Sequence, residues 1–109
     1  MDDVLLVIST FPDAEMARRV AREIVSDKLA ACANVTSPVM SIYRWKERIE
    51  EAAETIVMFK TTTARLPELQ NTLRERHPYD VPEIVALSIT DGLPEYLRWL
   101  SDSCARELI

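Results

Sequence analysis

The fold is decided by the stretch VLLVI at residues 4–8, a continuous run of β-branched and aliphatic side chains. A strand with one face in water alternates apolar and polar residues, so this unbroken run predicts a strand that is buried on both faces. A second run of the same kind, TIVMF at residues 55–59, is closed by Lys60. Two such strands require a sheet that is covered on both sides.

The residues after Pro12 change from strand-like to helical spacing. Asp13 is a favourable N-cap, and Met16, Val20 and Ile24 recur every four residues. This pattern predicts an amphipathic helix that ends near residue 28.

Thr63 is a candidate N-cap for a second helix, whose apolar stripe is formed by Leu66, Leu69 and Leu73. This helix must end before Pro78, because a residue that precedes proline is displaced from the α region. After a turn at Gly92, residues 93–103 predict a short third helix.

The remaining extended segments are a strand at residues 29–35, a second extended piece at residues 39–45, and residues 84–89, which are counted as the fourth strand. The charged stretch at residues 46–53 is interpreted as the end of a hairpin. The resulting order, β-α-β-β-α-β-α, is typical of a ferredoxin-like split βαβ sandwich, an α+β fold, here with an added C-terminal helix. The length of 109 residues predicts a single domain over residues 1–109.

In this fold both crossover helices pack on the same face of the sheet. The other face is left bare, although its strands are apolar on both sides and the last helix is too short to cover it. Soluble monomers rarely expose so large an apolar surface. We therefore expect the bare face to pack against other copies of the chain in a closed homo-oligomer.

Composition excludes several classes of protein. A net charge of -5 and a pI near 4.9 argue against nucleic-acid binding, which needs clustered and unpaired Lys and Arg. No apolar run approaches the roughly 20 residues that span a bilayer, so no membrane association is expected. The acidic start, Met1-Asp2-Asp3, lacks the basic region of a secretory signal and predicts a cytoplasmic protein. In that reducing compartment Cys32 and Cys104 are expected to be free, buried thiols.

The most unusual stretch is HPYDVPE at residues 77–83. Its prolines stiffen the chain and hold the polar side chains in fixed directions, which makes this loop a candidate site. The same residues are equally compatible with a structural role, in which His77 caps the end of a helix. A second candidate, YRWK at residues 43–46, favours a subunit interface over a ligand platform.

Motifs for metal binding and catalysis are scarce. His77 is the only histidine and no cysteines stand at zinc-site spacing, so a preformed metal site within one chain is not expected. Gly92 is the only glycine, which excludes glycine-rich phosphate loops. Cys32 lies in an apolar run that predicts an inert thiol. We expect neither an enzyme nor a required cofactor, because no nucleophile, base and orienting group can be assembled.

Five blocks of the sequence resemble one known family in order and spacing. They are LAACAN at residues 29–34, SIYRW at 41–45, KTT at 60–62, HPYDVPE at 77–83 and YLRW at 96–99. These blocks extend over almost the whole chain and resemble the CutA divalent-cation-tolerance family. The resemblance implies a ferredoxin-like, PII-like subunit that assembles as a homotrimer, and an association with tolerance to divalent metal ions, copper in particular.

Carried over residue by residue, the resemblance implies clefts between subunits that bind a metal ion or a small anion. The clefts would be lined by Tyr43, Trp45, Lys60, His77, Tyr79 and Glu83. A divalent metal such as copper would use His77 with Cys32 or Glu83, from one subunit or from neighbouring ones. The alternative functions are an enzyme that uses the cleft around His77, or a trimeric scaffold for a partner protein.

Three positions depart from the family pattern. Glu47 stands in the hairpin turn where many relatives have glycine, so the turn must form without the residue best suited to positive φ. Some relatives have a cysteine at the position of Ser9 and a second histidine at that of Arg76. Because a hydroxyl and a guanidinium are poor copper ligands, these two positions argue against tight copper binding.

Overall fold

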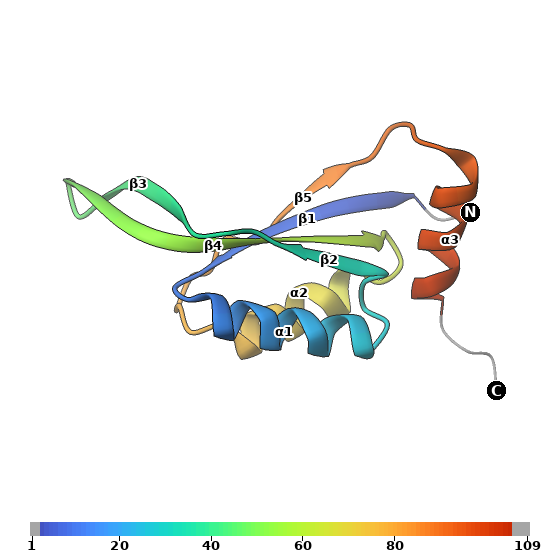
Figure 1. Cartoon of the computed structure of the whole chain (residues 1–109), viewed down its shortest axis with the longest axis horizontal. Helices are drawn as coiled ribbons and strands as arrows, with labels where there is room; N and C mark the ends of the chain where they lie inside the picture. Colours follow the sequence, from blue (N-terminus) through green and yellow to red (C-terminus); the bar gives the residue numbers. More distant parts are fainter. Residues whose placement is uncertain (1–2, 106–109) are drawn as a thin grey trace.

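The chain folds into an antiparallel sheet with two helices on one face and a third helix at one end (Figure 1). The computed structural model describes residues 3–105. Its elements are β1 (Val4–Phe11), α1 (Ala14–Ser26), β2 (Cys32–Val35), β3 (Val39–Trp45), β4 (Arg48–Thr62), α2 (Leu66–Arg76), β5 (Val85–Ser88) and α3 (Pro94–Cys104).

The sheet has the strand order β2-β4-β1-β5, and β3 pairs with β4 beyond the end of β2. The register places Val7 of β1 opposite Phe59 of β4 and Ala86 of β5. Phe59 in turn lies opposite Ala33 of β2. Each crossover helix therefore joins two strands that are separated by one other strand, as the split βαβ prediction requires.

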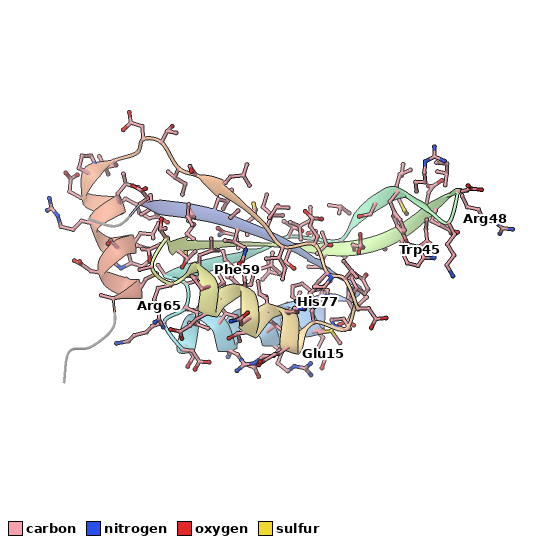
Figure 2. All side chains as sticks on the ribbon, turned by 180° about the vertical axis from the view of Figure 1, so that it is seen from behind. Glu15, Trp45, Arg48, Phe59, Arg65 and His77 are labelled. Carbon is pink, nitrogen blue, oxygen red and sulfur yellow. The ribbon has the colours of Figure 1, made fainter. Side chains whose placement is uncertain are left out.

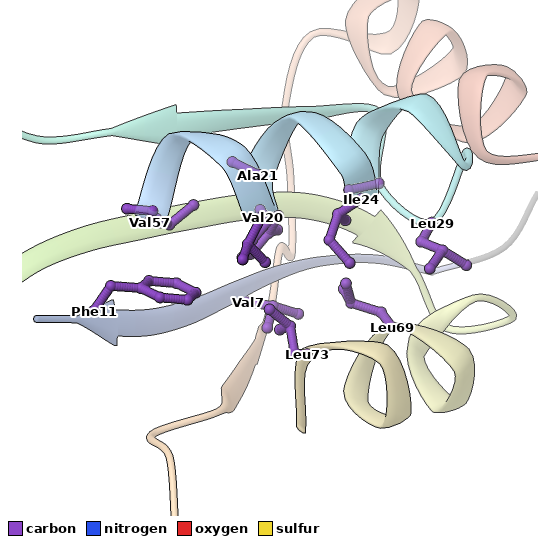
Figure 3. Packing of buried hydrophobic residues seen from close by; sticks show 12 residues of the cluster. Val7, Phe11, Val20, Ala21, Ile24, Leu29, Val57, Leu69 and Leu73 are labelled. Carbon is purple, nitrogen blue, oxygen red and sulfur yellow. The ribbon is translucent and has the colours of Figure 1, made fainter. Parts of the chain in front are cut away.

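The core lies between the sheet and the helices α1 and α2 (Figure 3). Its largest fully buried members are Val7, Phe11, Val20, Ile24, Val57, Phe59, Leu69 and Leu73. The spacing that predicted the two helices is the spacing of their buried residues, since α1 buries positions 20 and 24 and α2 buries positions 69 and 73.

Hydrogen bonds at the helix ends show which N-cap prediction was right. The Asp13 carboxylate accepts a bond from the Met16 N–H at 2.8 Å, which confirms the predicted cap of α1. Thr63 does not cap α2. Its hydroxyl donates to the Asp3 carbonyl at 3.2 Å, and the helix begins two residues further on, after Arg65.

The largest difference from the prediction is at residues 46–53, which are mostly strand and not the end of a hairpin. The turn comprises only Lys46 and Glu47, at φ 48° and 66°, and β4 then runs for 15 residues from Arg48. Together β3 and β4 form a two-stranded arm that projects beyond the sheet (Figure 1). Because most of the arm's side chains are exposed on both faces, charged residues are tolerated in its strands.

Other strand boundaries also differ from the prediction, most clearly those of β1 and β2. β1 continues past residue 8 to Phe11, because Ser9 and Thr10 extend the ladder with β4. β2 begins at Cys32 and not at residue 29, because the chain first makes a tight turn in which the Leu29 N–H donates to the Ile24 carbonyl at 3.1 Å.

The second face of the sheet is mostly uncovered. α3 lies at one end of it, where Leu100 and Cys104 pack on Val4 and Ala31. Farther along, the strands present six apolar side chains that we call the open face: Leu6, Ile8, Ile56, Met58, Val85 and Leu87. Val85 and Leu87 are 44% and 48% exposed. The bare apolar face that the sequence predicts is therefore present in the single chain.

None of the helices in residues 3–105 has the length and hydropathy needed to cross a membrane.

Candidate functional site

The His77 ring is buried at the end of α2 and joins three segments of the chain. Its Nε2 lies 2.7 Å from the Thr10 carbonyl, and its Nδ1 accepts the Tyr79 N–H at 3.2 Å. The ring also stacks on Phe11 with a centroid distance of 4.4 Å. Since a carbonyl can only accept, Nε2 carries the proton and the imidazole is neutral.

Burial lowers the pKa of His77 below its ordinary value, against the smaller opposing effects of the Thr10 carbonyl and the Glu54 charge. His77 is the C-cap residue of α2, as the structural alternative predicted, but its side chain binds β1 and its own loop and not the carbonyls of the helix. Because both ring nitrogens have partners, neither is available to a metal ion or to an incoming proton unless a hydrogen bond breaks.

Tyr79 extends this cluster to the base of the arm. Its hydroxyl donates to the Glu54 carboxylate at 2.8 Å. Burial, followed by the hydrogen bond to Glu54, raises the pKa of Tyr79 to about 12, and the nearby Tyr43 adds to the shift. Of the six predicted cleft residues, His77 and Tyr79 are therefore in contact, and Tyr79 meets Glu54. Tyr43 lies opposite Glu50 on the arm and is close enough to affect the pKa of Tyr79.

Sequence reasoning did not select Glu54, because it lies between the charged stretch and the apolar run of β4. One feature of the sequence could have indicated Glu54. It stands two residues before Ile56, so both side chains lie on the same face of the strand.

The other three predicted residues lie elsewhere. Trp45 is at the tip of the arm and is 60% exposed, with the Lys46 ammonium 5.8 Å from its ring centre. Figure 2 shows Trp45 at the tip and His77 near the point where the arm leaves the sheet. Glu83 is exposed in the loop before β5.

Lys60 belongs to a second cluster, below α3. Its ammonium donates to the Tyr96 hydroxyl at 3.3 Å, and the same hydroxyl lies 3.8 Å from the Cys32 sulfur. Lys60 has no carboxylate partner within residues 3–105. It is six positions along β4 from Glu54, a distance of roughly 20 Å along an extended strand. Within one chain, the predicted cleft is therefore divided between the base of the arm and the surface below α3.

Comparison with known proteins agrees with this architecture. A family model described as CutA1 divalent ion tolerance protein matches residues 5–103. The chain belongs to the CutA1 family. A curated relative from Thermus thermophilus, the divalent-cation tolerance protein CutA, is 44% identical over 103 residues, which are 94% of this chain and 98% of that protein.

Protein CutA of Mus musculus is 42% identical over 91 residues, which are 84% of this chain but only 51% of the mouse protein. The chain therefore spans about half the length of some of the curated relatives that it matches.

Solved structures of CutA1 proteins have the same fold. The Thermus thermophilus protein superposes with a TM-score of 0.91 at 42% identity, over 94% of this chain and 99% of that one. CutA1 from Oryza sativa gives 0.93 at 36% identity, over 97% of each chain. The predicted α+β fold, ferredoxin-like and similar to PII proteins, is confirmed.

In this member of the CutA1 family, one chain does not assemble a metal centre from the described residues. No group of three or more His, Cys, Asp or Glu side chains in residues 3–105 is placed to hold an ion. Cys32 lies opposite Lys60, whereas the Thr10 partner of His77 lies opposite Ile56, about 13 Å farther along the sheet. His77 and Cys32 therefore do not meet within the chain.

The other positions relevant to metal binding are partly or fully buried, or are engaged in contacts with neighbouring side chains. Cys32 is half-buried and not fully buried as predicted, whereas Cys104 is buried, and both are free. Burial raises the pKa of the Cys104 thiol, with smaller effects from its neighbours. Ser9 is buried on the helix-covered face, and Arg76 pairs with Glu23 at 3.1 Å.

Proposed function

We propose that this chain acts in tolerance to divalent cations, as its named relatives do, and that it works as a homotrimer with ligand clefts between subunits. The open face is the observation that carries this proposal. It is a surface of six apolar side chains on two central strands and an edge strand, with α3 over only one end. Covering a side chain of this size contributes about 1.5–3 kcal/mol relative to leaving it in water.

The strand edges support a ring of subunits. Within the described residues, β3 pairs only with β4 and β5 pairs only with β1, so each has an unpaired edge. The two edges differ in length and sequence, so a contact between β3 of one copy and β5 of the next is heterologous. Successive heterologous contacts produce a closed ring when the rotation between subunits returns to the first copy. The family resemblance implies three copies in that ring.

The cluster around Lys60 supports binding of a small ligand. A half-buried ammonium without a described carboxylate partner favours an anion, and the adjacent Cys32 thiol is a soft donor that suits copper. Since the ring nitrogens of His77 are occupied, copper bound at Cys32 would need further donors from a second subunit. We favour binding over catalysis, because His77 cannot accept a proton without releasing Tyr79.

We also propose a cytoplasmic location, which two free cysteines support because thiols persist in reducing compartments. This location differs within the family. The relative from Arabidopsis thaliana is named a chloroplastic protein, and the protein from Archaeoglobus fulgidus with a solved structure is named periplasmic.

Light scattering and calorimetry test these proposals separately. The assembled protein should have three times the 12.5 kDa mass of the chain. Titration with copper or zinc should release heat, Cys32→Ser should reduce it, and Cys104→Ser should leave it unchanged. A stable monomer at micromolar concentration would contradict the trimer, and unchanged heat in Cys32→Ser would contradict the proposed donor. Cells that lack the protein should grow more slowly in added copper and recover when the gene is restored.

A further inference from the structure

A groove lies beside the edge strand β2 and adjoins the Lys60 cluster at Cys32. It has a volume of about 590 Å³ and lies between the C-terminal half of α1, the start of β2 and the side of α3. Figure 1 shows these three elements converging at one end of the molecule. The lining is mainly apolar and is formed by Ala21, Val25, Ala31, Ala33 and Trp99, with Cys32 at one side. A volume of this size is within the range of small-molecule sites, roughly 300–1,000 Å³.

Trp99 provides a flat aromatic wall for this groove. Its side chain is 46% exposed, although it packs against Tyr96 with a centroid distance of 5.4 Å. A large aromatic residue that stays half in water beside small alanines leaves room for another flat group. Stacked aromatic pairs contribute about 0.5–1.5 kcal/mol beyond the area they bury.

A polar depression of about 810 Å³ lies on the other side of α1 and shares Arg22 and Ser26 with the apolar groove. Its lining also includes Arg19, Glu23, Asp27 and Arg76. Both acids of this depression are engaged by Arg76, at 3.1 Å to Glu23 and 3.7 Å to Asp27.

Arg19 and Arg22 have no carboxylate partner within residues 3–105. Their spacing of three residues places both on the same side of α1. Arg22 lines the apolar groove itself, whereas Arg19 lines only the adjoining polar depression.

We propose that this groove binds a small organic anion with a flat aromatic part, of the aromatic carboxylate or sulfonate class. The aromatic part lies against Trp99 and the alanines, and the anionic group binds Arg22, with Arg19 beside it. Guanidinium groups suit this role because their planar set of donors matches two oxygens of one anion. The proposed ligand needs no metal ion and makes no use of the open face, although Cys32 at the side of the groove is also the donor proposed above for copper.

Anilinonaphthalene sulfonate is a suitable probe, because it combines a flat aryl group with one negative charge. We would titrate it into the assembled Trp45→Phe protein, in which Trp99 is the only tryptophan. Quenching of Trp99 emission by energy transfer is expected on binding. Phenylnaphthylamine, which lacks the sulfonate, measures the contribution of the aryl group alone.

Arg22→Gln should weaken binding of the sulfonate about fivefold, the effect of losing one hydrogen bond to a charged group at a partly exposed site, and should leave the neutral probe unaffected. Arg18→Gln is the matched control, since Arg18 is exposed on the same helix and lines neither depression. In the wild-type protein the sulfonate should also slow alkylation of Cys32 by maleimide, while Cys104 stays buried.

Three results would overturn the proposal. One is equal sulfonate binding by the Arg22→Gln and Arg18→Gln proteins. Another is unchanged Trp99 emission and unchanged Cys32 alkylation at saturating probe. The third is a Trp99 that acrylamide cannot reach in the assembled protein, because another copy of the chain would then cover the groove.

Discussion

At the scale of single residues, His77 determines how the loop after α2 is held. Its ring connects the end of β1, through the Thr10 carbonyl, to the amide of Tyr79, and it fills the space over Phe11. A buried side chain that satisfies two backbone groups and packs against an aromatic ring is costly to replace. The most prominent candidate in the sequence therefore has a structural role within one chain.

This role predicts a pH dependence of stability. The unfolded chain protonates His77 near pH 6.5, whereas burial lowers its pKa in the folded protein. Between those two pKa values the unfolded chain binds more protons, so the free energy of unfolding falls as the pH falls. The contribution of the neutral ring is complete above pH 6.5 and decreases below it.

Urea unfolding between pH 7.5 and pH 5.5 (roughly one unit on each side of the usual His pKa) measures this effect. His77→Gln should be less stable at neutral pH and should lack the slope. Because the chain contains only one histidine, no second imidazole can produce such a slope. Parallel curves for the two proteins would exclude His77 as its source.

Glu47 predicts a gain of stability on substitution. Its φ of 66° lies in the left-handed region, which costs a residue with a side chain about 1–2 kcal/mol and costs glycine little. After subtracting the greater entropy of glycine in the unfolded chain, Glu47→Gly should raise the free energy of unfolding by about 0.5 kcal/mol. Thermal unfolding would detect it.

The control is Glu51→Gly, in the paired part of the same arm, where φ is not positive. Glycine there should lower stability by roughly 0.5–1 kcal/mol. Equal effects at both positions would show that the backbone angle of Glu47 is not responsible.

Sequence reasoning could identify the stiff loop at residues 77–83, because prolines and polar side chains are local features. It could not show that both ring nitrogens of His77 are occupied. The Thr10 partner is 67 residues away in the sequence, and no local pattern signals that contact. The division of the predicted cleft has the same cause, because Lys60 and Glu54 share one strand whose full length was not predicted.

At the scale of elements, Arg65 holds the two crossover helices together. Its guanidinium, on a side chain that is 9% exposed, donates to the Lys28 carbonyl at 3.2 Å and to Glu68 at the same distance. Since Lys28 lies just after the end of α1 and Glu68 in the first turn of α2, one buried cation links the end of one helix to the start of the next.

Arg65→Met should therefore lower the free energy of unfolding by about 2 kcal/mol, because the apolar stem is kept and the charge-assisted bonds are lost. Arg74→Met, on the exposed side of α2, should change it by less than about 0.5 kcal/mol. Both changes in the free energy of unfolding can be measured from the midpoints of denaturant unfolding curves, provided that the dependence on denaturant concentration is the same for the variants and the wild type. A loss below that of Arg74→Met would mean that packing of the stem, and not the bonds, matters.

Helices were easier to predict than the arm, for a physical reason. Positions 20, 24, 69 and 73 face a core, so burial imposes a period on the sequence. The arm has no such core within the chain, and its strands include exposed residues such as Arg44 and Glu51 on both sides of the turn. The arm is held together by backbone hydrogen bonds between β3 and β4. Backbone hydrogen bonds place little constraint on which side chains occur, so the sequence pattern does not indicate them.

At the scale of the whole molecule, the two crossover helices cover only one face of the sheet, and the other face is mostly exposed in the single chain. Met58 lies opposite Ile8 near the middle of the open face. Met58→Glu would place a carboxylate in the interface that we propose, where burying an unpaired charge is costly. The protein should then shift towards monomers in analytical ultracentrifugation, while its helical circular dichroism signal is maintained.

Asn71→Glu adds the same charge on the exposed side of α2 and should leave the assembly intact. If both substitutions, or neither, changed the sedimentation coefficient, the open face would not be the contact surface.

The overall fold was predictable because two apolar runs and two helical periods leave few arrangements of a chain of this length. The bare face of the sheet was predictable from the same apolar runs. These strands are apolar on both faces, but both crossover helices pack on only one of them. The location of a ligand was not predictable to the same extent. It depends on which side chains different copies bring together, and the sequence of one chain contains no local sign of that.

The arm can vary in length without a change of fold. Its tip, Lys46 and Glu47, is far from the core in a molecule that measures 49 Å along its longest axis. Shortening each strand of the arm by two residues would keep the type of pair that closes the turn and the register at the base, where Glu54 meets Tyr79. Removing a residue from one strand alone would force a bulge or a slip that turns the following side chains to the opposite face. The reach of the arm is thus open to change in matched steps, independently of the domain that carries it.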